Sequence, residues 1–140
     1  MARVLGVDLG SRRIGLALSD PDGRLATPHA LVERSGDRST DHRTILAQAR
    51  EAGASRIVVG LPLSLSGDAG PAARAVLEEV EALQAEAGDT VTIDTYDERL
   101  TTVIAESRLR EARVPRRTRR RAIDQTAAAV MLQSYLEAPS

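Results

Sequence analysis

The sequence predicts an α/β fold built on a mixed five-stranded sheet, with three antiparallel strands followed by parallel βα units and helices on both faces. Two apolar runs, residues 3–9 and 13–19, are joined by a short glycine-containing turn, which favours antiparallel pairing. Further along, short β-branched runs alternate with helical segments, as in parallel βα units. Because the 140 residues hold no repeat and no long linker, we expect one domain over residues 1–140.

The first three strands follow from side-chain alternation and turn chemistry. Ile14, Leu16 and Leu18 alternate with small residues, as a half-buried strand requires. The segment DPDGR at 20–24 is typical of a tight turn. A hairpin is therefore expected, with a third strand near 24–32.

A helix is expected after the third strand. The polar segment ERSGDRST indicates a loop, and Thr40 or Asp41 is the expected cap of the helix. The helical pattern runs to Glu51 and stops at Gly53.

The second half of the chain has the pattern of βα units. The segment RIVVGLP at 56–62 is a short β-branched run that ends in glycine and proline, as a buried parallel strand does. Residues 61–71 form a loop, and Pro71 suits the first turn of a helix. The remaining elements are expected as a helix to residue 87, a strand over 90–98, and helices over about 102–112 and 120–136.

Composition excludes several classes of protein. The chain has no cysteine, so disulfides and thiolate metal sites are excluded, and a metal would need oxygen or histidine ligands. No apolar stretch approaches the roughly 18 residues of a membrane span, and the opening MARVLGVDLG lacks the long apolar region of a signal peptide. We therefore expect a cytoplasmic protein with no membrane partner.

Charge and aromatic content limit how nucleic acid could be bound. The net charge of −1 argues against a uniformly basic binder, and two tyrosines with no phenylalanine or tryptophan argue against base-stacking platforms. All nineteen cationic side chains are arginine. Six of them lie within RVPRRTRRR at 113–121, which indicates either a solvated loop or a contact with a phosphate backbone, and we favour the contact.

Three acids fall where an α/β sheet gathers its ligands. Asp8 ends the first strand and Glu98 ends the fifth, and the carboxyl ends of parallel strands share one edge of the sheet. Asp124 lies one turn into the last helix, where the small Ala127–Ala129 segment allows close packing on the sheet. We expect Asp8, Glu98 and Asp124 to converge.

Three converging carboxylates repel one another unless a cation neutralises them. Oxygen ligation with open water positions suits Mg²⁺ or Mn²⁺, and two such ions about 4 Å apart support phosphodiester hydrolysis. Each acid also has a simpler interpretation. Asp8 could form a turn, and the negative charges of Glu98 and Asp124 could interact with the positive N-terminal ends of helices.

Four segments, in order, carry a resemblance to a known family: VDLGSRRIGLALSD, IVVGLPLSLSGDAGP, DERLTT and IDQTAAAVMLQSYL. Together they resemble the YqgF family over about residues 3–136, and DERLTT with VVGLP is the most specific part. That family is described as pre-16S ribosomal RNA nucleases, also called Holliday-junction-resolvase-like, with an RNase H-like fold. The resemblance implies that Asp8, Glu98 and Asp124 are catalytic and hold the metal ions. DLGSRRIG also resembles the first phosphate loop of actin-type and sugar kinases, but those enzymes need two such domains.

Arginines and one loop are the candidates for substrate binding. Arg12 and Arg13 follow Asp8 in the turn, and each could equally be a solvated turn residue. The loop at 61–71 could bring hydroxyls and N–H groups to a phosphate. The expected substrate-binding residues are Arg12, Arg13, Ser64, Arg99, Arg116, Arg117 and Arg120. His29 and His42 have no partner at ligand spacing, and Glu78, Glu79 and Glu81 fit the exposed face of a helix.

The sequence therefore predicts a metal-dependent endonuclease that uses Mg²⁺ or Mn²⁺, with two ions expected. The resemblance implies processing of the 5′ end of the 16S ribosomal RNA precursor, with a ribosomal particle as a candidate partner. A resolvase of Holliday junctions or other branched DNA is the alternative substrate class, and a dimer would match the two-fold symmetry of such a junction. A non-catalytic nucleic-acid-binding factor is the third interpretation. The chain is expected to be a monomer or a homodimer.

Overall fold

The computed structural model describes residues 3–64, 66–99 and 127–138. The elements are β1 (Arg3–Leu9), β2 (Arg13–Ser19), β3 (Ala26–Glu33), α1 (Arg38–Ala52), β4 (Ala54–Leu61), α2 (Pro71–Ala87), β5 (Thr92–Asp97) and α5 (Ala127–Glu137). The strands form one sheet in the order β3-β2-β1-β4-β5. β2 pairs antiparallel with β1 and β3, whereas β4 pairs parallel with β1 and β5. The mixed five-stranded sheet is confirmed.

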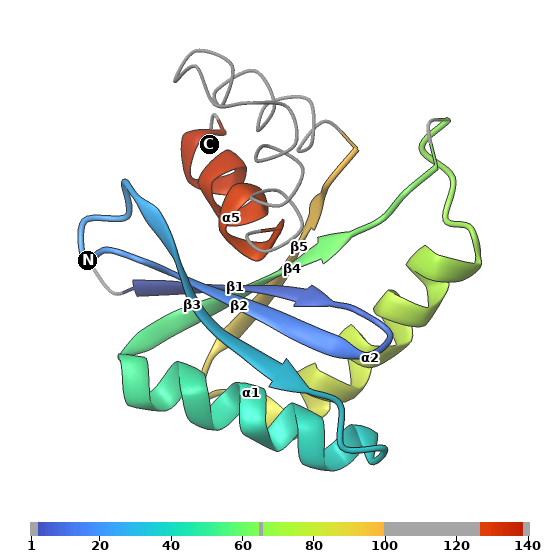
Figure 1. Ribbon diagram of the computed structural model, residues 1–140, viewed down its shortest axis with the longest axis horizontal. Helices are drawn as coiled ribbons and strands as arrows, with labels where there is room; N and C mark the ends of the chain where they lie inside the picture. Colours follow the sequence, from blue (N-terminus) through green and yellow to red (C-terminus); the bar gives the residue numbers. More distant parts are fainter. Residues whose placement is uncertain (1–2, 65, 100–126, 139–140) are drawn as a thin grey trace.

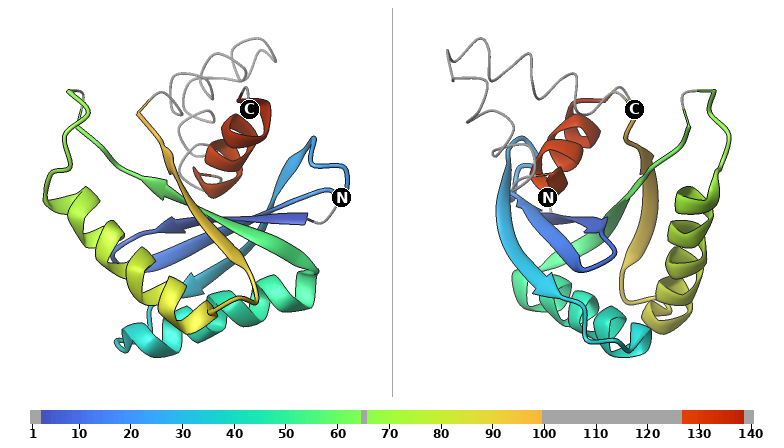
Figure 2. Two further views of the ribbon diagram at one scale, coloured as in Figure 1. Left: turned by 180° about the vertical axis from the view of Figure 1, so that it is seen from behind. Right: turned by 45° about the vertical axis from the view of Figure 1, so that its right-hand side comes forward.

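Helices cover both faces of the sheet, as predicted. Figure 1 shows α1 and α2 on one side and α5 on the other, and the second view in Figure 2 agrees. The larger core lies under α1 and α2 and includes Leu5, Val7 and Ile57. The smaller core lies under α5 and includes Val58 and Leu132. Alternation along each strand thus divides its side chains between two cores.

The α5 helix packs close to the sheet because β1 has a glycine beneath it. A Cβ atom on Gly6 would lie 2.9 Å from the Cβ of Leu132 and 3.3 Å from the carbonyl oxygen of Ala128. Any larger residue at position 6 would push the helix away from β1. The small residues at the beginning of α5 do allow close packing, as the sequence predicted.

The predicted cap of α1 is wrong. The N-cap is Asp37, whose backbone is extended with φ −120° and ψ 110°, and Thr40 and Asp41 already lie inside the helix. Asp41 instead accepts a hydrogen bond from the N–H of Ser35 at 3.0 Å, so its carboxylate ties down the loop before the helix. The end at Gly53 is as expected, with φ +73° in the left-handed region.

Two sequence predictions lie outside the described residues, namely the helix over 102–112 and the first part of the helix over 120–136. Within the part of the chain that is described, no helix has both the length and the apolar character needed to cross a membrane.

Candidate functional site

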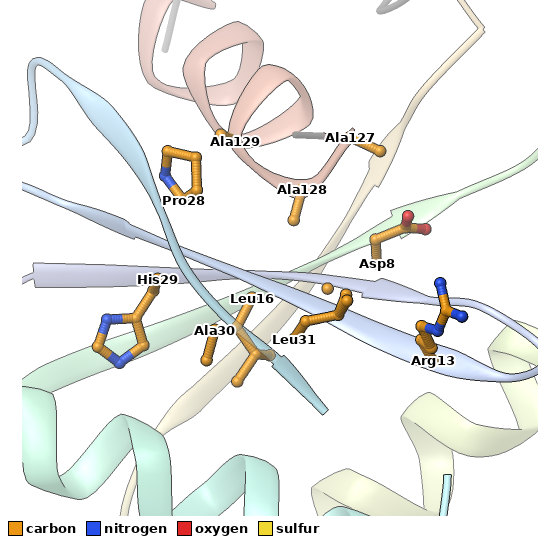
Figure 3. Close-up of a pocket in the computed structure, with 11 residues that line it drawn as sticks. Asp8, Arg13, Leu16, Pro28, His29, Ala30, Leu31, Ala127, Ala128 and Ala129 are labelled. Carbon is orange, nitrogen blue, oxygen red and sulfur yellow. The ribbon is translucent and has the colours of Figure 1, made fainter. Parts of the chain in front are cut away.

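Asp8 lies on the face of the sheet that α5 covers. It follows Val4 and Gly6 in the strand alternation and is in register with Gly15 of β2, which leaves room for its side chain. Figure 3 shows the Asp8 carboxylate between the beginning of α5 and the Arg13 side chain. The structure therefore places Asp8 at the edge of the sheet that the sequence predicted.

Glu98 reaches the same face from β5. Its N–H donates to the carbonyl oxygen of Leu61 at 3.2 Å, which continues the β4–β5 pairing beyond the end of β5. Its carboxylate oxygen Oε2 fills the space that a Cβ on Gly60 would need. Glu98 can fold over β4 toward Asp8 only because residue 60 has no side chain.

The sequence analysis missed the part that Gly60 plays in placing Glu98, since this glycine was interpreted only as the end of a strand. A signal was present. In RIVVGLP the glycine stands two residues after Val58, so it belongs to the face of β4 that meets α5. A glycine inside a strand marks a place where another group approaches the backbone closely.

Asp8 and Glu98 form a pair of carboxylates whose ionised forms are disfavoured. Burial raises the pKa of Asp8. Burial also raises the pKa of Glu98, and the negative charges of Asp8 and Asp97 raise it further. Among the described residues, neither side chain has a hydrogen bond or ion pair that would stabilise its charge. A cation bound between the two acids would relieve both burial and repulsion.

The donor set fits a hard divalent cation. Both groups offer carboxylate oxygens, the ligands that Mg²⁺ and Mn²⁺ prefer. The described residues hold no group of three or more acid, histidine or cysteine side chains at metal-binding positions. Asp124, the third acid expected here, lies outside the described residues. The structure thus brings two of the three predicted acids together.

Arg12 and Arg13 lie in and just after the turn that follows Asp8. Both are exposed, and Arg13 forms a surface ion pair with Glu33, with Nε and Oε1 3.1 Å apart. An exposed pair of this kind contributes little to stability and is easily exchanged for a phosphate. The substrate-binding role of both arginines stays a prediction.

Ser64 and Arg99 lie close to one turn within the loop at 61–71. The Ser64 hydroxyl accepts a hydrogen bond from the N–H of Asp68 at 3.1 Å, so it helps to shape this turn. The Arg99 guanidinium lies 3.3 Å from where a Cβ on Gly67 would stand, and its Nε donates to Asp97 at 2.7 Å. Their role in substrate binding stays a prediction, and Arg116, Arg117 and Arg120 lie outside the described residues.

A pocket of about 510 Å³ extends from Asp8 across β2 and β3 beneath the beginning of α5 (Figure 3). It is lined by Asp8, Arg13, Gly15, Leu16, Pro28, His29, Ala30, Leu31 and the three alanines Ala127–Ala129. The sequence analysis did not find this pocket, because its walls come from three strands and a helix that are distant in the chain.

The predicted exposure of Glu79 and isolation of His42 are wrong. Glu79 is 6% exposed and His42 is 3% exposed. His42 Nε2 lies 2.8 Å from Glu79 Oε1, and Arg34 donates two hydrogen bonds to the same carboxylate at 2.9 and 2.8 Å. The helix pattern contained a hint, because Glu79 lies next to the buried stripe formed by Val76, Val80 and Leu83.

A family model described as RuvX, Holliday junction resolvase, matches residues 2–138. A relative from Nocardia farcinica (strain IFM 10152) is 46% identical, over 96% of this chain and 77% of its own length. One from Desulforudis audaxviator (strain MP104C) is 42% identical, over 96% and 93%. Both carry the provisional name pre-16S rRNA nuclease.

Among solved structures, RuvC of T. thermophilus in complex with Holliday junction substrate matches with a TM-score of 0.58. The match covers 97% of this chain and 94% of that one at 16% sequence identity. At this identity the likeness concerns the fold alone, and it agrees with the expected RNase H-like arrangement.

Proposed function

Since this chain belongs to the RuvX family, described as Holliday junction resolvases, we propose that its nuclease activity depends on divalent cations held by Asp8 and Glu98. The chain is an endonuclease that hydrolyses phosphodiester bonds. The observation that carries the proposal is the pair of partly buried carboxylates with raised pKa values and no cationic partner among the described residues.

Asp8 and Glu98 would hold the cation from the ends of β1 and β5, and Asp124 is the proposed third ligand. Two Mg²⁺ or Mn²⁺ ions bound there would supply the chemistry of phosphodiester hydrolysis, namely activation of a water and stabilisation of the leaving oxygen. The work of the chain is to hold the two carboxylates close together and partly shielded from water, so that a bound cation stabilises their ionised forms. Gly60 and Gly15 serve this geometry by leaving room for the acid side chains.

The pocket beside Asp8 is the proposed path for the nucleic acid. Arg13 lines it close to the acid, where an exposed guanidinium can take a phosphate in place of Glu33. Arg99 follows Glu98 in the chain, and its guanidinium lies against Gly67, in the turn at Ser64 beyond the end of β4. We propose that these groups hold the backbone on either side of the scissile phosphate, together with the arginines at 116, 117 and 120.

The proposed substrate is the precursor of 16S ribosomal RNA, cleaved at its 5′ end in the cytoplasm, with a ribosomal particle as the setting. The names of the two relatives support this substrate. The family description and the fold shared with RuvC favour branched DNA as the second candidate. Monomer and homodimer are both compatible with RNA, whereas a four-way junction is best matched by a two-fold dimer.

Cleavage of both substrates by the same preparation tests the proposal. The wild-type protein is incubated with precursor RNA and with a four-way DNA junction, with Mn²⁺ or with chelator. We expect the RNA to be cleaved with Mn²⁺ and not with chelator. The cleavage rate of Asp8→Asn should be lower by more than about a hundredfold, since even changes to residues around a metal ligand have effects of that size.

The matched control is Asp94→Asn, which removes the same charge from the opposite end of β5, where Asp94 pairs with Arg56. This variant should cleave like the wild type. Full activity of a folded Asp8→Asn protein would overturn the metal assignment. Cleavage of the junction but not of the RNA would show that the substrate is branched DNA.

A further inference from the structure

A buried ionic cluster, made of Arg34, Glu79, Asp41 and His42, lies on the face of the sheet opposite the candidate site. Glu79 belongs to α2, His42 to α1, and Arg34 follows the end of β3. Arg34 donates to both oxygens of Glu79, and the side chains of Arg34 and Glu79 are only 18% and 8% exposed. A buried pair of this kind gives weak evidence for stability and often serves to define geometry instead.

The third donor of Arg34 is directed at the turn between β1 and β2. Its Nε donates to the carbonyl oxygen of Gly10 at 3.0 Å, and its backbone N–H donates to the carbonyl oxygen of Arg12 at 2.9 Å. One residue therefore connects two points of this turn to the Glu79 carboxylate. Only the planar guanidinium can direct donors to both groups at once.

The turn itself is tight and begins directly after Asp8 and Leu9. The N–H of Gly10 donates to the carbonyl oxygen of Asp8 at 3.1 Å, and a Cβ on Gly10 would lie 2.5 Å from the carbonyl oxygen of Arg13. The backbone of this turn thus sets the positions of Asp8, Arg12 and Arg13 relative to one another. A shift of this turn moves the acid and the arginines relative to each other.

We propose that Arg34 is a positioning residue for the nuclease reaction, which holds the β1–β2 turn so that Asp8 and the phosphate-binding arginines keep their relative geometry. The inference rests on the proposed function of Asp8. Glu79 fixes the orientation of the guanidinium, and His42 connects Glu79 to α1 without touching the turn.

The first test is structural and needs no activity. Amide hydrogen exchange is measured in wild type, Arg34→Lys and His42→Leu. A lysine keeps the charge opposite Glu79 but cannot also bond Gly10, so exchange in the segment 8–13 should accelerate severalfold in Arg34→Lys alone. Unchanged exchange in this segment of Arg34→Lys would overturn the inference, whatever the outcome for the proposed function.

The second test is kinetic, well below the melting temperature of each variant. A misplacement near 1 Å lowers rates by up to about a hundredfold, so kcat of Arg34→Lys should fall at least tenfold, with a smaller change in KM. His42→Leu should melt at a lower temperature and keep the wild-type kcat. A kcat that follows melting temperature across both variants would make Arg34 merely structural and refute the inference.

A second variant keeps the test decisive if Arg34→Lys does not fold. Glu79→Gln retains a hydrogen-bond acceptor but loosens the guanidinium, so its kcat should fall severalfold, and a wild-type kcat would contradict the inference. Asp8→Asn is run in parallel. If that variant stays active, the metal assignment fails, while the exchange result still decides the role of Arg34.

Discussion

The two faces of the sheet shift the pKa values of their carboxylates in opposite directions. Beneath α1 and α2, burial alone would raise the pKa of Glu79, but hydrogen bonds from Arg34 and His42 outweigh burial and lower it. Beneath α5, burial raises the pKa values of Asp8 and Glu98, and the charge of Asp8 adds to the shift at Glu98. All three side chains are carboxylates, and their partners determine whether the pKa is raised or lowered.

The difference separates an acid that the chain itself compensates from a pair of acids proposed to bind a cation. Glu79 receives its compensating charge from within the chain, so it connects α1, α2 and the end of β3. Asp8 and Glu98 have no such compensation among the described residues, which is the basis for proposing that a cation binds between them. Perturbed acids of this second kind mark binding and catalytic sites.

The largest expected effect is on the structural side of this comparison. Glu79→Gln removes the carboxylate that accepts two hydrogen bonds from Arg34 and leaves, among the described residues, only Asp41, 3.8 Å away, opposite this buried charge. The unfolding free energy should fall by about 3 kcal/mol. Urea unfolding measures the loss. Glu78→Gln, the exposed neighbour on α2, should stay within about 0.5 kcal/mol of wild type. Similar values for the two variants would show that the buried cluster is energetically unimportant.

The next effect concerns the functional side, where a cation should stabilise the fold. Mn²⁺ at a hundred times its Kd should raise the unfolding free energy by about 2.7 kcal/mol. The melting temperature should then rise by several degrees, at on the order of 3 °C per kcal/mol. The shift should vanish in Asp8→Asn and persist in Asp94→Asn. Equal shifts in all three proteins would place the cation elsewhere.

A smaller effect is expected from Gly60→Ala, which tests how Glu98 is placed. The new methyl group would take the position of the Glu98 carboxylate oxygen, whose flexible side chain can move away. The fold should survive, and the melting shift produced by Mn²⁺ should fall by at least half.

The matched control for this substitution is Gly70→Ala, where a Cβ meets nothing within 4 Å and φ is −76°. It should keep the full metal-dependent shift. If Gly60→Ala also keeps it, Glu98 does not depend on this glycine for its position.

The smallest effect is the pH dependence of the metal-free protein. The pKa of Asp8 is raised in the folded protein, so folding favours its protonated form. The contribution of Asp8 to the unfolding free energy is therefore fully present below its unfolded pKa and is lost as pH rises through the folded pKa. Glu79 behaves oppositely, because its stabilisation is present above its unfolded pKa and is lost as pH falls through the lowered value.

Relative to wild type in chelator, Asp8→Asn should therefore gain stability from pH 4 to pH 8, whereas Glu79→Gln should lose it. Melting temperatures at four pH values measure both trends. Parallel curves for the two variants would remove the distinction between the two kinds of acid.

Much of the architecture could be predicted because it depends on local patterns. The alternation at Ile14, Leu16 and Leu18, the DPDGR turn and the proline at the beginning of α2 each specify their own segment. The positions of Asp8 and Glu98 at strand ends followed from the same patterns. The cap of α1 was wrong because several polar residues compete there, and the loop contact from Ser35 to Asp41 decides among them.

The sequence by itself determined which segments are strands, that the sheet is mixed, and that acids end β1 and β5, since these properties depend on periodicity and on residues close together in the chain. Only the tertiary structure decided that Glu98 occupies the space above Gly60 and that Glu79 meets Arg34, 45 residues away in the chain. It likewise decided that Glu79 is compensated by Arg34 and that, among the described residues, Asp8 and Glu98 are not. The physical reason is that charge compensation and burial depend on neighbours that are distant in the chain. The local sequence around Arg34 or Glu79 contains no pattern that indicates its partner.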